Sequence, residues 1–106
     1  MAGKYTKHIT AHELKDRLEA GEKLHILDVR EEEEWAAGHI PGAVHIPLGA
    51  LSARHGELDK RAAHMVICLS GGRSGLACEY LEEIGYEVSN VAGGMSRWDG
   101  PVQYGI

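Results

Sequence analysis

The sequence predicts an α/β fold with a mostly parallel sheet, on three observations. Short apolar runs alternate with helical stretches along the 106 residues. Glycines follow several of the helical stretches, where a chain commonly leaves a helix. Strand–helix–strand order is typical of parallel sheets joined by right-handed crossovers. The length is that of one domain, and we assign residues 1–106 to it.

The order of elements follows from local patterns. Thr10 and Glu13 have the spacing of a capping box, and the helix that they begin is expected to end at Gly21. The predicted strands are residues 24–27, 43–46, 65–67 and 86–91. The other predicted helices are residues 31–37 and 75–84, with an irregular or helical segment at 48–58 and a final helical turn opened by Gly93-Gly94. The glutamates that lead the helix at 31–37 are interpreted as a solvated helix start, because acidic side chains suit that end of the helix dipole.

The segment from Cys68 to Ser74 carries the strongest chemical signal. Cys68 directly follows a predicted strand, Gly71 and Gly72 allow unusual backbone angles, and a helix follows. Backbone N–H groups of such a loop and of the helix start favour an anion, so the thiolate of Cys68 should be favoured over the thiol. This interpretation requires that the side chain can be reached and that the amides turn inward.

Composition excludes several classes of function. The formal charge of −5 and the lack of a basic stripe argue against nucleic-acid binding. No apolar run is long enough to cross a membrane, and the first residues lack a secretory signal, so a cytoplasmic protein is expected. Two cysteines then indicate reduced thiols. No cofactor is expected, and no metal site, because the spacing of His39 and His45 fits hydrogen-bonded scaffolding better than a zinc site.

Taken together, these segments resemble a single-domain rhodanese, a sulfurtransferase module. The resemblance runs from Ile9 to Trp98. The segments that carry it are Asp28-Val29-Arg30, Glu34-Trp35, Gly38 to Ala43, His45-Ile46-Pro47, Cys68 to Ser74, Gly93-Gly94-Met95 and Trp98. Each segment alone is a weak signal, but their order and spacing are specific.

The resemblance implies a five-stranded sheet flanked by helices on both faces, and a persulfide on Cys68. The sulfur would come from a small sulfur-containing anion such as thiosulfate or from a persulfide, and would pass to cyanide, a thiol or a protein. The loop that binds the substrate and the persulfide would consist of Leu69, Ser70, Gly71, Gly72, Arg73 and Ser74. Asp28 and Arg30 leave a strand next to this loop. They could touch the substrate, but we expect them to pair with nearby groups and to support the site by fixing the loops.

Two features set this chain apart from related patterns. Cysteine-dependent phosphatases place five residues between cysteine and arginine, whereas four separate Cys68 from Arg73, so little phosphatase activity is expected. Many rhodaneses carry arginine directly after the cysteine, where this chain has Leu69. The missing charge predicts weak use of thiosulfate, a dianion, and leaves a persulfide donor open.

Several roles stay open at this point. Arg73 could bind an anionic donor or brace the loop. Cys78 could form a disulfide with Cys68, although its place on the inward face of a helix favours a buried thiol. Trp35 and Trp98 are expected to be packing anchors. The alternative to an enzyme is a rhodanese-like module for protein recognition or sulfur relay.

Overall fold

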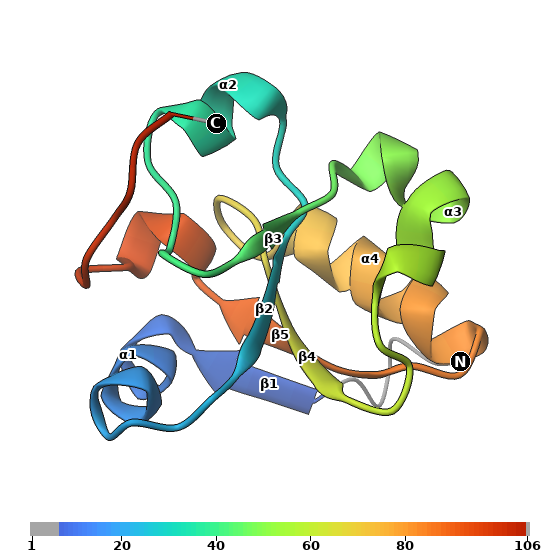
Figure 1. Cartoon of the computed structure of the whole chain (residues 1–106), viewed down its shortest axis with the longest axis horizontal. Helices are drawn as coiled ribbons and strands as arrows, with labels where there is room; N and C mark the ends of the chain where they lie inside the picture. The colour runs from blue at the N-terminus through green and yellow to red at the C-terminus, as the bar shows by residue number, and fades with distance from the viewer. Residues whose placement is uncertain (1–6, 106) are drawn as a thin grey trace.

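The structure, a computed structural model, describes residues 7–105. Its strands are β1 (Lys7–Thr10), β2 (His25–Asp28), β3 (Val44–His45), β4 (Ala63–Ile67) and β5 (Glu87–Ala92). Its α-helices are α1 (Ala11–Glu19), α2 (Glu32–Ala36), α3 (Leu51–Arg54) and α4 (Gly72–Glu83). Its 3₁₀ turns are η2 (Leu48–Ala50), η3 (His55–Glu57) and η4 (Gly94–Arg97). Figure 1 shows them around one central sheet.

The five strands form one sheet in the order β1-β5-β4-β2-β3, and every pair in it is parallel. The α/β expectation and the five-stranded sheet are therefore confirmed. The edge strand β1 was not among the strands predicted from apolar runs. Its burial explains why, since Ile9 is its only buried residue. An edge strand with one inward side chain leaves almost no apolar run in the sequence.

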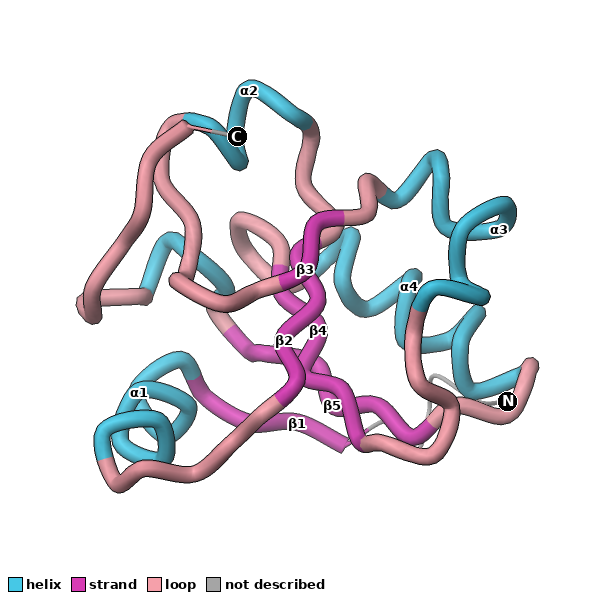
Figure 2. The backbone as a smooth tube through the Cα atoms, in the orientation of Figure 1, coloured by secondary structure: helices cyan, strands magenta, loops and turns pink. Residues whose placement is uncertain are grey.

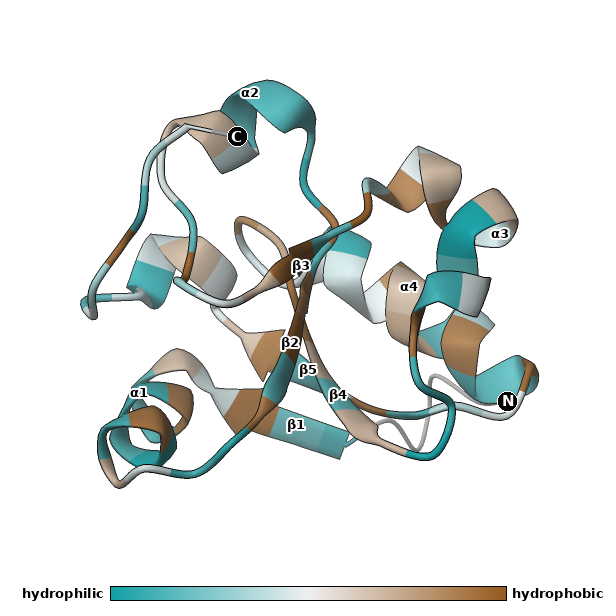
Figure 3. Cartoon of the chain, viewed as in Figure 1, coloured by the Kyte–Doolittle hydropathy of each residue, from teal (hydrophilic) through white to brown (hydrophobic). Residues whose placement is uncertain are grey.

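Helices cover both faces of the sheet, as expected. Successive residues of β4 point to opposite faces, so Val66 packs with α3 and α4, whereas Met65 and Ile67 pack with α1 and η4. The brown, hydrophobic segments of Figure 3 follow the central strands, which are enclosed by these two layers. A central strand that is buried on both faces needs apolar residues at successive positions, which explains the continuous apolar run Met65–Ile67 in the sequence.

Two element boundaries differ from the sequence prediction. The helix expected from Gly75 begins at Gly72, because Gly71 adopts a left-handed φ of 109° and serves as its N-cap. Helix α4 thus starts inside the predicted reactive loop. The segment at 48–58 resolves into η2, α3 and η3 in succession. The capping box of Thr10 and Glu13 is present as predicted.

The carboxyl ends of β2, β4 and β5 face the same edge of the sheet, because the strands are parallel. The loops after these strands therefore meet there, as the backbone trace of Figure 2 shows. Helix α2 and the turn η4 flank the loop that follows β4 (Figure 1). Among residues 7–105, no helix has the length and apolar content needed to span a membrane.

Candidate functional site

The side chain of Cys68 lies inside a small loop of backbone amides. The N–H of Gly71 donates a hydrogen bond to Sγ at 3.1 Å. The Ser74 hydroxyl lies 3.3 Å from the same sulfur. The amides near Cys68 therefore turn inward, which is one of the two conditions set by the sequence.

The electrostatics of the loop favour the thiolate. Burial raises the pKa of Cys68, but hydrogen bonds from the Ser74 side chain and from the backbone of Ser74, Gly71 and Ser70 outweigh it. The net effect holds the pKa below the ordinary value of a cysteine. A sulfur anion is therefore stabilised without a general base.

The second condition, a reachable side chain, is not met in this conformation. Cys68 is only 1% exposed. The residues that follow it are at the surface, since Leu69, Ser70 and Gly72 are all exposed. Cys68 is thus buried although the residues directly after it are at the surface, and in this conformation it presents almost no surface to a reagent. The expectation of an open cysteine was wrong for a physical reason: the inward amides that stabilise the sulfur also enclose it.

Asn90 on β5 fixes the shape of the loop, and sequence reasoning missed it. Its Oδ1 accepts a hydrogen bond of 2.6 Å from the Ser74 hydroxyl, and its Nδ2 donates one of 3.1 Å to the carbonyl of Gly71. Both ends of the amide are thereby used, and Asn90 is buried. A buried asparagine in a strand was the available signal, because a buried amide needs partners on both sides.

The turn η4 holds the other side of the loop. The N–H groups of Met95 and Ser96 donate to the carbonyls of Cys68 and Leu69, at 2.8 and 2.9 Å. The backbones approach so closely that a Cβ on Gly94 would overlap the Cys68 carbonyl and lie 2.7 Å from that of Leu69. Gly94 also has a positive φ of 54°. Glycine at this position lets η4 pull these carbonyls outward, which leaves N–H groups facing the sulfur.

Arg73 pairs with Glu34 of α2. Its two terminal nitrogens donate to the two carboxylate oxygens at 2.7 and 2.8 Å. These bonds, with one from the backbone of Glu31, lower the pKa of Glu34 to about 2. Arg73 could have bound an anionic donor or braced the loop, and this contact agrees with bracing the loop. Glu34, assigned from the sequence to a solvated helix start, instead ties α2 to the loop.

Asp28 and Arg30 form a buried ion pair after β2. The guanidinium binds both carboxylate oxygens at 2.9–3.1 Å and donates a further bond of 2.8 Å to the carbonyl of Gly38. The Arg30 carbonyl in turn bonds His45 at 2.7 Å. These contacts connect the end of β2 with Gly38 and with His45 of β3, and they use Nε and Nη2 of Arg30, which agrees with a supporting role for the pair.

This architecture has known relatives. The model of the rhodanese-like domain matches residues 10–100. The chain belongs to the rhodanese-like domain family. It is 47% identical to "Putative sulfurtransferase YtwF" of Bacillus subtilis over 89% of this chain and 91% of that protein. It is 36% identical to "Sulfurtransferase" of Allochromatium vinosum over 85% of each chain. The crystal structure of a rhodanese-like domain protein from Staphylococcus aureus superposes with a TM-score of 0.89 at 36% identity, covering 95% of this chain and 100% of that one.

The second cysteine of this rhodanese-like domain is unsuited to chemistry in the folded state. Cys78 is fully buried within the core beneath α4. Burial raises the pKa of its thiol to about 12, and the charges of Glu82 and Cys68 add to the effect. Cys78 thus lies on the inward face of the helix, as predicted, and both cysteines are free thiols.

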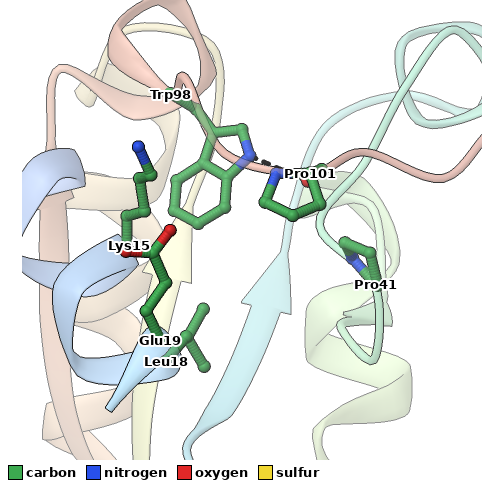
Figure 4. Close-up of a pocket in the computed structure, with 6 residues that line it drawn as sticks. All are labelled: Lys15, Leu18, Glu19, Pro41, Trp98 and Pro101. Carbon is green, nitrogen blue, oxygen red and sulfur yellow. Dashed lines mark hydrogen bonds between the residues drawn. The ribbon is translucent and has the colours of Figure 1, made fainter.

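Trp35 stacks with two histidines of the rhodanese-like domain. Its ring centroid lies 3.5 Å from that of His39 and 4.7 Å from that of His45, with the rings nearly parallel in both pairs. Within the described part of the chain, no three His, Cys, Asp or Glu side chains could together hold a metal ion. The Trp98 ring packs on the core beside α1. It also forms one wall of a cleft of about 230 Å³, shown in Figure 4, whose lining contains no cysteine.

Proposed function

We propose that this protein is a sulfurtransferase that carries sulfur as a persulfide on Cys68. The observation that carries the proposal is the hydrogen bond of 3.1 Å that the Gly71 N–H donates to Sγ inside the loop. The Ser74 hydroxyl, whose single proton is shared with Asn90, lies 3.3 Å from the same sulfur and adds to the stabilisation of a sulfur anion. The relatives named as sulfurtransferases support the same chemistry.

The proposed reaction has two balanced steps. The Cys68 thiolate attacks the outer sulfur of a donor such as thiosulfate, a new S–S bond forms, the S–S bond of the donor breaks, and sulfite leaves with the electron pair. An acceptor nucleophile such as cyanide or a thiolate then takes the terminal sulfur, and the electrons of the cleaved bond return to Cys68. The kinetics should be ping-pong, since the enzyme holds the sulfur between the steps.

Arg73 and the pair Asp28–Arg30 act in this proposal as supports. Arg73 is held by Glu34, and Arg30 by Asp28 and Gly38, so neither guanidinium is free to follow a substrate. Leu69, Ser70, Gly71, Gly72 and Ser74 form the wall around the persulfide. The enclosure of Cys68 adds one requirement: the loop opens before the donor enters.

Intact-protein mass after incubation with thiosulfate or with cysteine persulfide tests the proposal. Wild type and Cys78→Ser should each gain the mass of one sulfur, and Cys68→Ser should gain none. Cyanide should then remove the added mass. A wild-type protein that stays unmodified with both donors would refute the catalytic proposal.

The enclosed thiol also favours a second function, a module for protein recognition or sulfur relay. In that case the loop opens only against a partner protein. A thiosulfate:cyanide assay and transfer from a persulfidated cysteine desulfurase distinguish the two functions. Turnover in the first assay supports the enzyme, and sulfur gain in the second assay alone supports the relay.

A further inference from the structure

One cation at the carboxyl edge of the sheet has no carboxylate partner. Arg30 is bound by Asp28, and Arg73 by Glu34. Arg97, the last residue of η4, is exposed and makes no ion pair or hydrogen bond with any residue between 7 and 105. Its charge is therefore available to a ligand.

The backbone places Arg97 beside the loop that encloses Cys68. Its neighbour Ser96 donates a hydrogen bond to the carbonyl of Leu69 at 2.9 Å. The Arg97 side chain folds back over Gly93, where a Cβ would lie 2.5 Å from its Cγ. Gly93 in turn lies beside Gly71, since a Cβ on Gly71 would lie 3.7 Å from the nitrogen of Gly93. Gly71 is the residue whose N–H donates to the sulfur of Cys68.

We propose that Arg97 anchors the negatively charged group of the sulfur donor at the solvent-facing side of this loop, which we call its mouth. The inference deepens the proposed function and rests on it. Leu69, the residue directly after Cys68, brings no charge to the mouth. A guanidinium on a flexible stem, held next to the loop by η4, supplies the attraction from a different element. The chemical class expected is a sulfane sulfur bonded to an anionic group, as in thiosulfate.

Alkylation of Cys68 by two reagents of equal size tests the charge at the mouth. Iodoacetate is an anion and iodoacetamide is neutral, and both react with the same thiolate. The ratio of their rates therefore cancels any change in the pKa of Cys68 or in the opening of the loop. Arg97→Gln should lower the ratio of iodoacetate to iodoacetamide by roughly threefold at low ionic strength, and added salt should reduce this difference.

Arg61→Gln is the matched control. It removes the same charge from an exposed side chain just before β4, at the opposite end of the sheet from Cys68. Its ratio should equal that of wild type. Equal ratios in wild type and Arg97→Gln would overturn the inference, and so would an equal fall in Arg61→Gln.

Kinetics with thiosulfate give a second readout. Arg97→Gln should raise KM by about threefold or more while kcat changes less than twofold, and Arg97→Lys should restore part of the loss. A fall in kcat with unchanged KM would contradict an anchoring role. Wild type could gain no sulfur from any donor while Arg97→Gln still lowers the alkylation ratio. That result would refute the proposed function but would support the conclusion that Arg97 attracts anions to the loop around Cys68. A thiol that reacts with neither reagent in the folded protein overturns both.

Discussion

Arg73 and Glu34 join α4 to α2 through two parallel hydrogen bonds of 2.7 and 2.8 Å, across 39 positions of sequence. The first residues of α4 are also part of the loop around Cys68, because the helix begins at Gly72. The ion pair therefore connects the shape of the loop to a helix that follows a different strand.

Glu34→Gln should weaken this connection and lower stability by about 1 kcal/mol at pH 7, since both side chains are about one-third exposed and solvent screens them. The pKa of Glu34 is lowered from 4.5 to about 2, so its contribution is present above pH 4.5 and disappears as the pH falls towards 2. Urea unfolding of wild type and variant should differ most at pH 7, differ less at pH 3 and converge only near pH 2. A difference that stays constant with pH would show that the carboxylate charge is not responsible.

Ser74→Ala should raise the pKa of Cys68. The lost hydroxyl is 3.3 Å from the sulfur and lowers the pKa of the thiol in wild type. A shift of about one unit is expected for a lost hydrogen bond to a charged group. The pH dependence of the rate of iodoacetamide alkylation measures it. Ser70→Ala is the control, because Ser70 acts through its backbone and its variant should titrate like wild type.

Gly94→Ala should destabilise the protein by about 3 kcal/mol, from the collision with the loop carbonyls and the left-handed φ together. Gly42→Ala separates the two causes. Gly42 has a φ of 86°, and a Cβ there would meet no atom within 4 Å, so only the conformational cost of about 1–2 kcal/mol applies. Urea unfolding should rank wild type, Gly42→Ala and Gly94→Ala in that order. Equal losses in the two variants would mean that the close approach at Gly94 carries no cost.

Leu69→Arg should raise kcat/KM for thiosulfate by about tenfold, because a charge-assisted hydrogen bond is worth roughly 1.5–3 kcal/mol. Leu69 is 46% exposed, so the substitution needs no repacking of the core. Leu69→Gln tests polarity without charge and should stay close to wild type. An unchanged kcat/KM in Leu69→Arg contradicts the idea that the missing charge limits this donor.

The parts of the site that are local in sequence could be predicted. The strand, the glycines and the helix after Cys68 are within a few residues of one another, and so are Asp28 and Arg30. The two-faced burial of β4 leaves an apolar run that any reader of the sequence can find. These features depend on neighbours along the chain, which a pattern records directly.

Contacts between distant segments could not be predicted in the same way. Asn90 is 16 positions from Ser74, and the sequence around it does not indicate that its side chain reaches Ser74 and Gly71. The partner of Arg73 depends on where α2 docks, which the acidic run did not specify. The enclosure of Cys68 depends on φ of 109° at Gly71, which brings the start of α4 three residues earlier than its apolar spacing indicated.

Asn90 and Gly94 are contributed by the last strand and the turn after it, whereas Cys68 follows the strand before. During synthesis on the ribosome, the cysteine therefore emerges before the two residues that shape its surroundings. Until β5 and the turn after it are added, the hydrogen bonds that Asn90 and η4 make to the loop around Cys68 are missing. If Cys68 carries sulfur as proposed, the complete surroundings of the sulfur are therefore assembled only when the last strand joins the sheet.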